Sequence, residues 1–231
     1  MIKIEYLTAD GFEAAIRGMR NPLNSWSKSD SMWANETDGQ SSKPYYSIGQ
    51  NDLGLAQRLI DAGPEHAKFL RQINASFDIT TSLYLFKEFD TYKINTTSNS
   101  CSTMHKITEK EFTLGDFSCE HLTKQSLDCL LETIDMLNSY RNIYVNWEEQ
   151  DEFIQQGFNY DKKLVWWQLI QLLPSSYNQK RTVTMNYAVL RNIIHQRKNH
   201  KLDEWHGFIE SLKELPYANE LLFYHNLEVR E

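Results

Sequence analysis

The sequence is poor in the residues that build common nucleotide-binding loops, metal sites and disulfide frameworks. It has nine glycines in 231 residues, with no Gly-x-Gly-x-x-Gly run and no phosphate-loop Gly-Lys-Ser/Thr sequence, which argues against a Rossmann or P-loop protein. The three cysteines, Cys101, Cys119 and Cys129, are odd in number and lack metal-ligand spacing, so we expect free thiols in a reducing cytoplasm. The seven histidines form no His-x-x-x-His pattern, and we expect no metal site.

Two further absences concern charge and hydropathy. The net charge is −7, whereas a general nucleic-acid binder normally carries a basic face, so we expect no general nucleic-acid binding. No apolar run approaches membrane-spanning length, and Met1–Tyr6 lacks the apolar core of a signal peptide. We therefore expect a cytoplasmic protein that makes no use of a membrane.

Aromatic residues, in contrast, are abundant. Six Trp, twelve Tyr and eleven Phe predict stacking surfaces or large interfaces. Hydrophobic periodicity predicts one helix-rich α+β domain over residues 1–231 with a small sheet. We expect strands at 2–7, 73–79 and 179–184, and helices at 10–19 (capped by Asp10), 52–62, 81–93, 122–137, 163–173, 186–198 and 202–215. The polar, aperiodic stretch 21–50 is too long for a routine connection and predicts an expanded loop.

The stretch from Glu88 to His105 is the most informative part of the chain. It contains nine consecutive small or polar residues, Asn95 to Thr103, without Gly or Pro. Ordinary turns recruit Gly, Pro or Asp, whereas this stretch offers hydroxyls, amides and backbone N–H groups that can hold a phosphate or a sugar. Residue types alone favour the alternative, a Ser/Thr-rich surface loop.

A second informative segment is the helix expected from Asn186. Its apolar stripe contains Leu190, Ile193 and Ile194, and Asn186 and Arg197 lie on the same side, roughly 16 Å apart along the axis. An arginine beside a buried stripe needs an anionic partner or a route to water. A ligand phosphate and a structural ion pair both satisfy that need, and ion pairs are the more common case.

Together these segments resemble the flavin-dependent thymidylate synthases. That family carries an Arg-His-Arg-x-x-Ser-x-Asn-x-x-Ser-x-Arg signature after a Gln, then a Leu-Pro, then a Thr-x-Asn that begins a helix closing with Arg. Here Leu173-Pro174 matches the Leu-Pro and Thr184-Met-Asn186 matches the Thr-x-Asn without a gap. Asn192 and Arg197 fall on the Asn and Arg of the closing helix.

The central signature keeps the family's spacing but not its arginines. Glu88 falls on the Gln of the family signature. Its Arg-His-Arg is replaced by Thr91, Tyr92 and Lys93, and its first Ser and its Asn by Thr96 and Ser98. Cys101 falls on the second Ser, and Thr103 falls on the last Arg. His66 falls on the first His of an upstream family motif, and Arg17 and Arg20 resemble an early Arg that precedes a Ser-aromatic pair. The resemblance covers about residues 10 to 215.

The resemblance implies a homotetramer that binds FAD and a pyrimidine nucleotide such as dUMP. It implies methylation of dUMP to dTMP with methylenetetrahydrofolate and NADPH, without a covalent protein nucleophile, so no side chain is assigned a catalytic role. The implied FAD contacts are Thr91, Tyr92, Lys93, Ser98, Asn99, Asn186, Asn192 and His66. The implied nucleotide contacts are Glu88, Ser100, Cys101, Ser102, Thr103 and Arg197.

Loss of the signature arginines leaves a second possibility open. Each arginine is a bidentate, permanently charged phosphate clamp, and Arg197, Lys93, Lys180 or Arg181 could replace it. The alternative is a relative of the same fold that binds flavin or nucleotide, or only assembles, without thymidylate synthesis.

Overall fold

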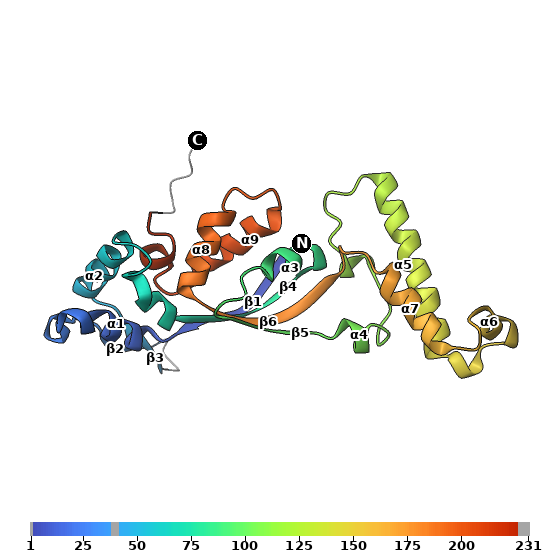
Figure 1. The fold of residues 1–231 in the computed structure, drawn as a ribbon, viewed down its shortest axis with the longest axis horizontal. Helices are drawn as coiled ribbons and strands as arrows, with labels where there is room; N and C mark the ends of the chain where they lie inside the picture. Colours follow the sequence, from blue (N-terminus) through green and yellow to red (C-terminus); the bar gives the residue numbers. More distant parts are fainter. Residues whose placement is uncertain (1, 38–41, 226–231) are drawn as a thin grey trace. The chain divides into compact units, whose positions relative to one another are not determined.

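The computed structural model describes residues 2–37 and 42–225, and these divide into two compact units. Unit 1 contains residues 1–3, 79–91 and 99–181, and unit 2 contains the described parts of 4–78, 92–98 and 182–231. Four strands contribute residues to both units. A single domain over 1–231 therefore stays a prediction, and each unit is described in turn (Figure 1).

The four-stranded sheet is small and antiparallel, with strand order β1-β4-β6-β5. Its strands are β1 (Ile2–Asp10), β4 (Asn74–Ser82), β6 (Asn178–Asn186) and β5 (Thr96–Ser100). Alternate residues of β4 and β6, including Phe77 and Val183, are buried, as the two-residue period of a strand requires. On the opposite face, Thr182 Oγ1 donates to Asp78 Oδ1 at 2.7 Å.

The predicted α+β class and the three predicted strands are confirmed, but the reading of 95–103 as a loop is wrong at 96–100. Thr96–Ser100 forms the edge strand β5. The segment contains β-branched threonines and no Gly or Pro, so it can extend and pair. Its polar side chains suit a sheet edge because they discourage pairing with other chains.

Helices in unit 2 surround an aromatic core. They are α1 (Phe12–Arg20), α2 (Gln50–Asp61), α8 (Tyr187–Arg197) and α9 (Asp203–Ser211), with the short turns η3 (Ala67–Gln72), η6 (Leu212–Glu214) and η7 (Ala218–Leu222). Tyr187, Trp205 and Phe208 are almost fully buried, and Phe77 packs on Phe208 with ring centroids 5.5 Å apart. Burial of such rings contributes much of the stability of a unit of this size.

The start of α1 differs from the prediction. Gly11, not Asp10, occupies the N-cap, with a left-handed φ of 95°. A Cβ on Gly11 would lie 2.2 Å from the carbonyl oxygen of Gln72, so both the backbone conformation and the close approach require glycine.

The stretch 21–50 contains regular structure where an aperiodic loop was expected. It has the short turns η1 (Asn21–Leu23) and η2 (Trp26–Lys28), and β2 (Met32–Thr37) pairs antiparallel with β3 (Ser42–Ser47) in the register Trp33↔Tyr46. The aperiodic reading is therefore wrong at 32–37 and 42–47. Cross-strand aromatic packing explains the hairpin, since the Trp33 and Tyr46 rings meet edge-on at 5.5 Å.

A buried ion pair ties this stretch to α2. The Asp52 carboxylate is fully buried and accepts hydrogen bonds from Arg20 Nε, Ser29 Oγ and Ser31 Oγ. Arg20 also donates to the carbonyl of Lys28 at 3.1 Å. The three guanidinium nitrogens of Arg20 and both carboxylate oxygens of Asp52 take part in hydrogen bonds. A buried charge pair is tolerated under this condition.

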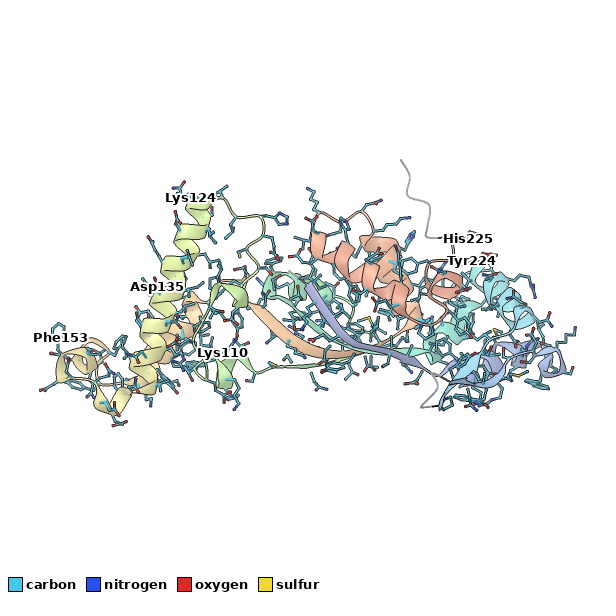
Figure 2. All side chains as sticks on the ribbon, turned by 180° about the vertical axis from the view of Figure 1, so that it is seen from behind. Lys110, Lys124, Asp135, Phe153, Tyr224 and His225 are labelled. Carbon is cyan, nitrogen blue, oxygen red and sulfur yellow. The ribbon has the colours of Figure 1, made fainter. Side chains whose placement is uncertain are left out.

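Unit 1 is built around a helical pair. Its helices are α3 (Leu83–Phe89), α4 (Thr103–Lys106), α5 (Lys124–Val145), α6 (Glu152–Gly157) and α7 (Lys162–Leu172), with the turns η4 (Leu114–Asp116) and η5 (Trp147–Glu149). Helices α5 and α7 pack side by side (Figure 1) around a core that includes Leu137 and Leu169. Phe153 on α6 is labelled in Figure 2. This residue is 84% exposed.

The long helices do not resemble membrane spans. Across residues 2–37 and 42–225, no helix is both long and apolar enough to cross a bilayer.

Candidate functional site

A chain of hydrogen bonds in unit 2 connects three of the predicted site residues. Arg197 Nε donates to the hydroxyl of Tyr92 at 2.9 Å, and that hydroxyl donates to Gln196 Oε1 at 3.0 Å. Gln196 Nε2 in turn donates to Asn192 Oδ1 at 3.0 Å. We call Arg197, Tyr92, Gln196 and Asn192 the α8 relay. It brings together residues from the segment after α3 and from the last two turns of α8.

Aromatic rings hold the charged end of the α8 relay. The Arg197 guanidinium carbon lies 5.6 Å from the centroid of the Tyr92 ring and 5.2 Å from that of Trp205. The two rings meet edge-on at 5.9 Å. Arg197 itself is half-buried. Cation–π attraction and the hydroxyl bond therefore orient the guanidinium before any ligand arrives.

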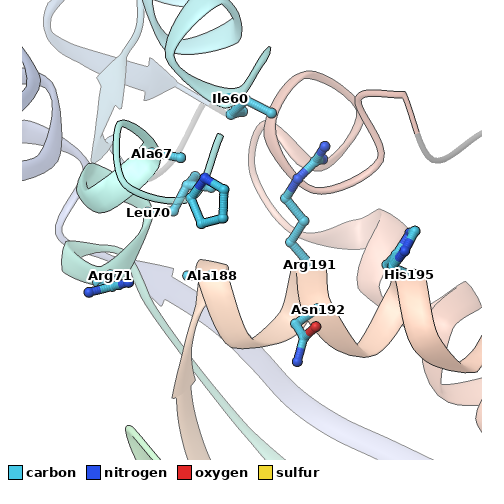
Figure 3. Close-up of a pocket in the computed structure, with 9 residues that line it drawn as sticks. Ile60, Ala67, Leu70, Arg71, Ala188, Arg191, Asn192 and His195 are labelled. Carbon is cyan, nitrogen blue, oxygen red and sulfur yellow. The ribbon is translucent and has the colours of Figure 1, made fainter. Parts of the chain in front are cut away.

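The other end of the α8 relay borders a cavity of ≈ 470 Å³. Figure 3 shows Arg191, Asn192 and His195 along α8, across the cavity from Ala67 and Leu70 of η3. The remaining lining residues are Ile60, Pro64, Arg71 and Ala188. The volume and the mixture of apolar walls with a few polar groups are typical of sites for small molecules and cofactors.

The relay fixes the orientation of the Asn192 amide. Its Oδ1 accepts from Gln196, and its Nδ2 group is the donor of the amide. Arg191 adds positive charge at the same wall. Its Nη1 donates to the carbonyls of Leu221 and Leu222 at 3.2 and 2.9 Å. Burial lowers the pKa of Arg191, yet a guanidinium remains charged at neutral pH.

Asn186 has a structural role at the other end of α8. Its side chain is buried and accepts a hydrogen bond from Val189 N at 3.0 Å, so it caps the helix. The expected Thr-x-Asn start of the helix is thus observed. The cap uses Oδ1, and it fixes where α8 begins and hence which residues face the cavity.

Several predicted residues lie in unit 1, around the ends of β5 and β6. Cys101 N donates to the carbonyl of Lys180 at 2.9 Å, and Gln179 Nε2 donates to Cys101 O and to Thr103 Oγ1 at 2.9 and 3.0 Å. Ser102 caps α4 by accepting from His105 N. The hydroxyls of Ser102 and Thr103 therefore already accept internal hydrogen bonds, as an ordinary structured loop would require.

The remaining predicted residues are dispersed and mostly exposed. Unit 1 carries Glu88 within α3, Thr91 after it, and Asn99 and Ser100 on β5. Unit 2 carries Lys93, Ser98 on β5, and His66, which precedes η3 and is exposed. The structure thus groups Tyr92, Asn192 and Arg197 directly, and it leaves the assignment of the others as a prediction.

The sequence reasoning missed four residues of this region: Gln196, Arg191, His195 and Arg71. One signal was available for Gln196. It follows Asn192 by four residues, and side chains at that spacing are neighbours on a helix surface. Arg20, which resembled a family site arginine, instead belongs to the buried Asp52 pair. Across the described residues, no group of three or more His, Cys, Asp or Glu could hold a metal ion.

Fold and site geometry define a helix-rich protein with a small antiparallel sheet and a cofactor-sized cavity beside α8. Two solved structures of the flavin-dependent thymidylate synthase ThyX from Helicobacter pylori, both complexed with FAD and dUMP, are similar to it. One is 17% identical with a TM-score of 0.63, over 98% of this chain and 100% of that one. The other is 16% identical with a TM-score of 0.63, over 99% and 100%. No family model and no curated protein matches the sequence. At this identity the likeness establishes a ThyX-like fold.

Proposed function

We propose that this chain binds FAD and a pyrimidine nucleotide, and most simply that it methylates dUMP to dTMP with methylenetetrahydrofolate and NADPH in the cytoplasm. The observation that carries the proposal is the α8 relay, which joins a cavity-lining amide, Asn192, to an oriented guanidinium, Arg197. An enzyme of this kind needs a site for a flat ring system and a fixed positive charge for a phosphate.

The residues around the cavity fit a flavin. Ile60, Leu70 and Ala188 provide apolar walls for a ring, and Asn192 Nδ2 can donate to a carbonyl or nitrogen of that ring. Arg191 and Arg71 can pair with the pyrophosphate. Once bound, FAD would supply the redox chemistry, while these side chains would orient it and exclude water.

The nucleotide phosphate would be held by Arg197. Tyr92 would keep the guanidinium in place, and Lys93 would add a second positive charge. The unit 1 residues Ser100 to Thr103 are further proposed contacts. In a homotetramer they can come from a different subunit than α8, which is why we also propose that assembly.

One observation favours the alternative of binding without thymidylate synthesis. Tyr92 stands where the family signature has His, it is 9% exposed, and its hydroxyl already bonds Arg197 and Gln196. Thr91 and Lys93 likewise stand where that signature has arginines. The phosphate clamps of the central signature are therefore missing, so flavin binding can persist while the methyl-transfer reaction does not.

The experiment separates the two possibilities. Purified protein is incubated with excess FAD and desalted, and bound flavin is measured by absorbance and by the rise in melting temperature, which follows mass action. The loaded protein is then assayed for dTMP with dUMP, methylenetetrahydrofolate and NADPH. Flavin with dTMP supports the enzyme; flavin without dTMP supports the alternative. Absence of bound flavin together with an unchanged melting temperature would refute the enzyme and flavin binding, and would leave only a relative that binds nucleotide or assembles.

A further inference from the structure

A second hollow in unit 2 has a chemistry different from that of the α8 cavity. It encloses ≈ 920 Å³ between the end of β1, the start of α1, the β2–β3 hairpin and residues 214–217. Its lining shares no residue with the α8 cavity. We call it the hairpin pocket. Trp33, Tyr46, Tyr217, Asp10, Glu13 and Glu214 are among its lining residues.

Aromatic rings form much of the hairpin pocket. Trp33 is 58% exposed and pairs with Tyr46 in the hairpin register, so these two side chains lie on the same face. The Trp33 and Tyr46 rings are inclined by 73°, and an edge-on pair covers at most one ring face. Exposed ring faces carry partial negative charge, and they attract cations.

The charged residues of the lining all have the same sign. They are three carboxylates, Asp10, Glu13 and Glu214, and the lining contains no Lys, Arg or His. Trp33 Nε1 donates to Glu13 Oε2 at 3.3 Å, which places a carboxylate next to the largest ring. The Glu13 carboxylate also faces Arg17 at 3.9 Å, but both side chains are more than half exposed, and such a pair is weak.

The walls of the hairpin pocket are fixed by hydrogen bonds within unit 2. The Tyr217 hydroxyl accepts from Ile48 N at 2.8 Å and donates to Tyr46 O at 3.1 Å. Tyr187 OH donates to Pro216 O at 2.8 Å. A wall held in this way loses little conformational entropy when a ligand enters, so a modest number of contacts suffices for binding.

We propose that the hairpin pocket binds a small organic cation of the quaternary ammonium class. Aromatic faces and carboxylates surround such a group without needing to donate hydrogen bonds to it, and recognition of this kind is typical of aromatic cages. The proposal is independent of the flavin and nucleotide site, because it uses none of the residues assigned there.

The test compares a cation with a neutral molecule of the same shape. Choline and 3,3-dimethyl-1-butanol are each titrated into the full-length protein by calorimetry. We expect choline to bind at least about threefold more tightly than the neutral analogue, since the cation–π and carboxylate contacts depend on charge. The proposal would be overturned if choline and the neutral analogue bound with equal affinity. It would also be overturned if choline gave no heat of binding at concentrations of several millimolar.

Two variants locate the binding. Trp33→Ala and Glu13→Gln should each weaken choline binding by at least about threefold. Trp167→Ala on α7, which removes another exposed Trp, should leave it unchanged. Circular dichroism checks that each variant is folded; Glu13 is exposed, so Glu13→Gln remains informative even if Trp33→Ala does not fold. Unaltered choline binding in folded Glu13→Gln and Trp33→Ala would place the cation elsewhere and refute the site.

Discussion

The Tyr92 hydroxyl accepts a hydrogen bond from Arg197 Nε at 2.9 Å, although the two residues are 105 positions apart in the chain. The same hydroxyl donates to Gln196, so one phenol orients both a cation and an amide. Single substitutions can remove these hydrogen bonds, so their contribution to the proposed site can be tested.

Replacement of Arg197 tests nucleotide recognition directly. Arg197→Ala should weaken dUMP binding by about 2–5 kcal/mol if the phosphate pairs with this guanidinium. Arg197→Lys keeps the charge but loses the planar fork, and it should weaken binding less. Calorimetric titration of dUMP and dTMP measures both effects, and FAD binding should survive either change.

The control for Arg197 is Arg58→Ala, which removes the same charge from an exposed side chain on α2. If neither nucleotide binds the wild type and Arg197→Ala only lowers the melting temperature, Arg197 has a structural role and thymidylate synthesis should be abandoned.

Removal of the Tyr92 hydroxyl tests whether the α8 relay orients the site. Tyr92→Phe keeps the ring under Arg197 but leaves the Arg197 and Gln196 groups without this partner. We expect a loss of about 0.5–1.5 kcal/mol in stability, measured by urea unfolding, and weaker dUMP and FAD binding. Tyr45→Phe, at an exposed ring, is the matched control. Unchanged ligand affinity in Tyr92→Phe would show that the relay does not position the ligand groups.

The buried Asp52 carboxylate predicts an acid dependence of stability. Burial alone would raise its pKa, but hydrogen bonds from Ser31, Ser29 and Arg20 lower the pKa below the usual 3.8. A lowered folded-state pKa means that the stabilisation is fully present above the unfolded value and is lost as the pH falls through the folded value.

Asp52→Asn should therefore cost about 3–5 kcal/mol near neutral pH, because Arg20 is left buried without its charge partner. The difference between variant and wild type should shrink as the pH falls below 3.8. Urea unfolding from pH 3 to pH 7 measures both. A difference that is the same at all pH values would contradict the ionised pair.

The proposed homotetramer predicts that the chain is assembled at micromolar concentration. Unit 1 exposes large apolar side chains, among them Phe153, Val145 and Met136, which are 84%, 50% and 49% exposed. Light scattering should give a tetramer at micromolar concentration, most simply with D₂ symmetry. Phe153→Ser should weaken assembly if α6 contributes to an interface. A monomer in the wild type would rule out both the tetramer and a site shared between subunits.

Periodicity predicted the regular elements well because burial imposes it. The stripe of Leu190, Ile193 and Ile194 located α8, and the alternation around Phe77 located β4. Polar segments gave no such signal. The edge strand β5 exposes most of its side chains, and the β2–β3 hairpin is stabilised by Trp33 against Tyr46, a contact that depends on register rather than on composition.

The site was predictable only in part for a similar reason. Tyr92, Asn192 and Arg197 were selected by resemblance, and they lie together. Gln196 was not selected, because its importance comes from a hydrogen bond with Tyr92 across a long separation in sequence. Hydrogen-bond partners of that kind follow from tertiary packing, which local patterns do not encode.

The separation of the α8 relay along the chain also has a kinetic consequence. Tyr92 can reach Gln196 and Arg197 only after the intervening chain, more than a hundred residues long, has closed into a loop. The conformational entropy of this loop is lost before the contact contributes any stabilisation. The relay is therefore absent from any intermediate in which α8 has formed but the segment after α3 has not docked. Ligand-binding competence should appear last during refolding, together with completed unit 2, rather than with the formation of helix.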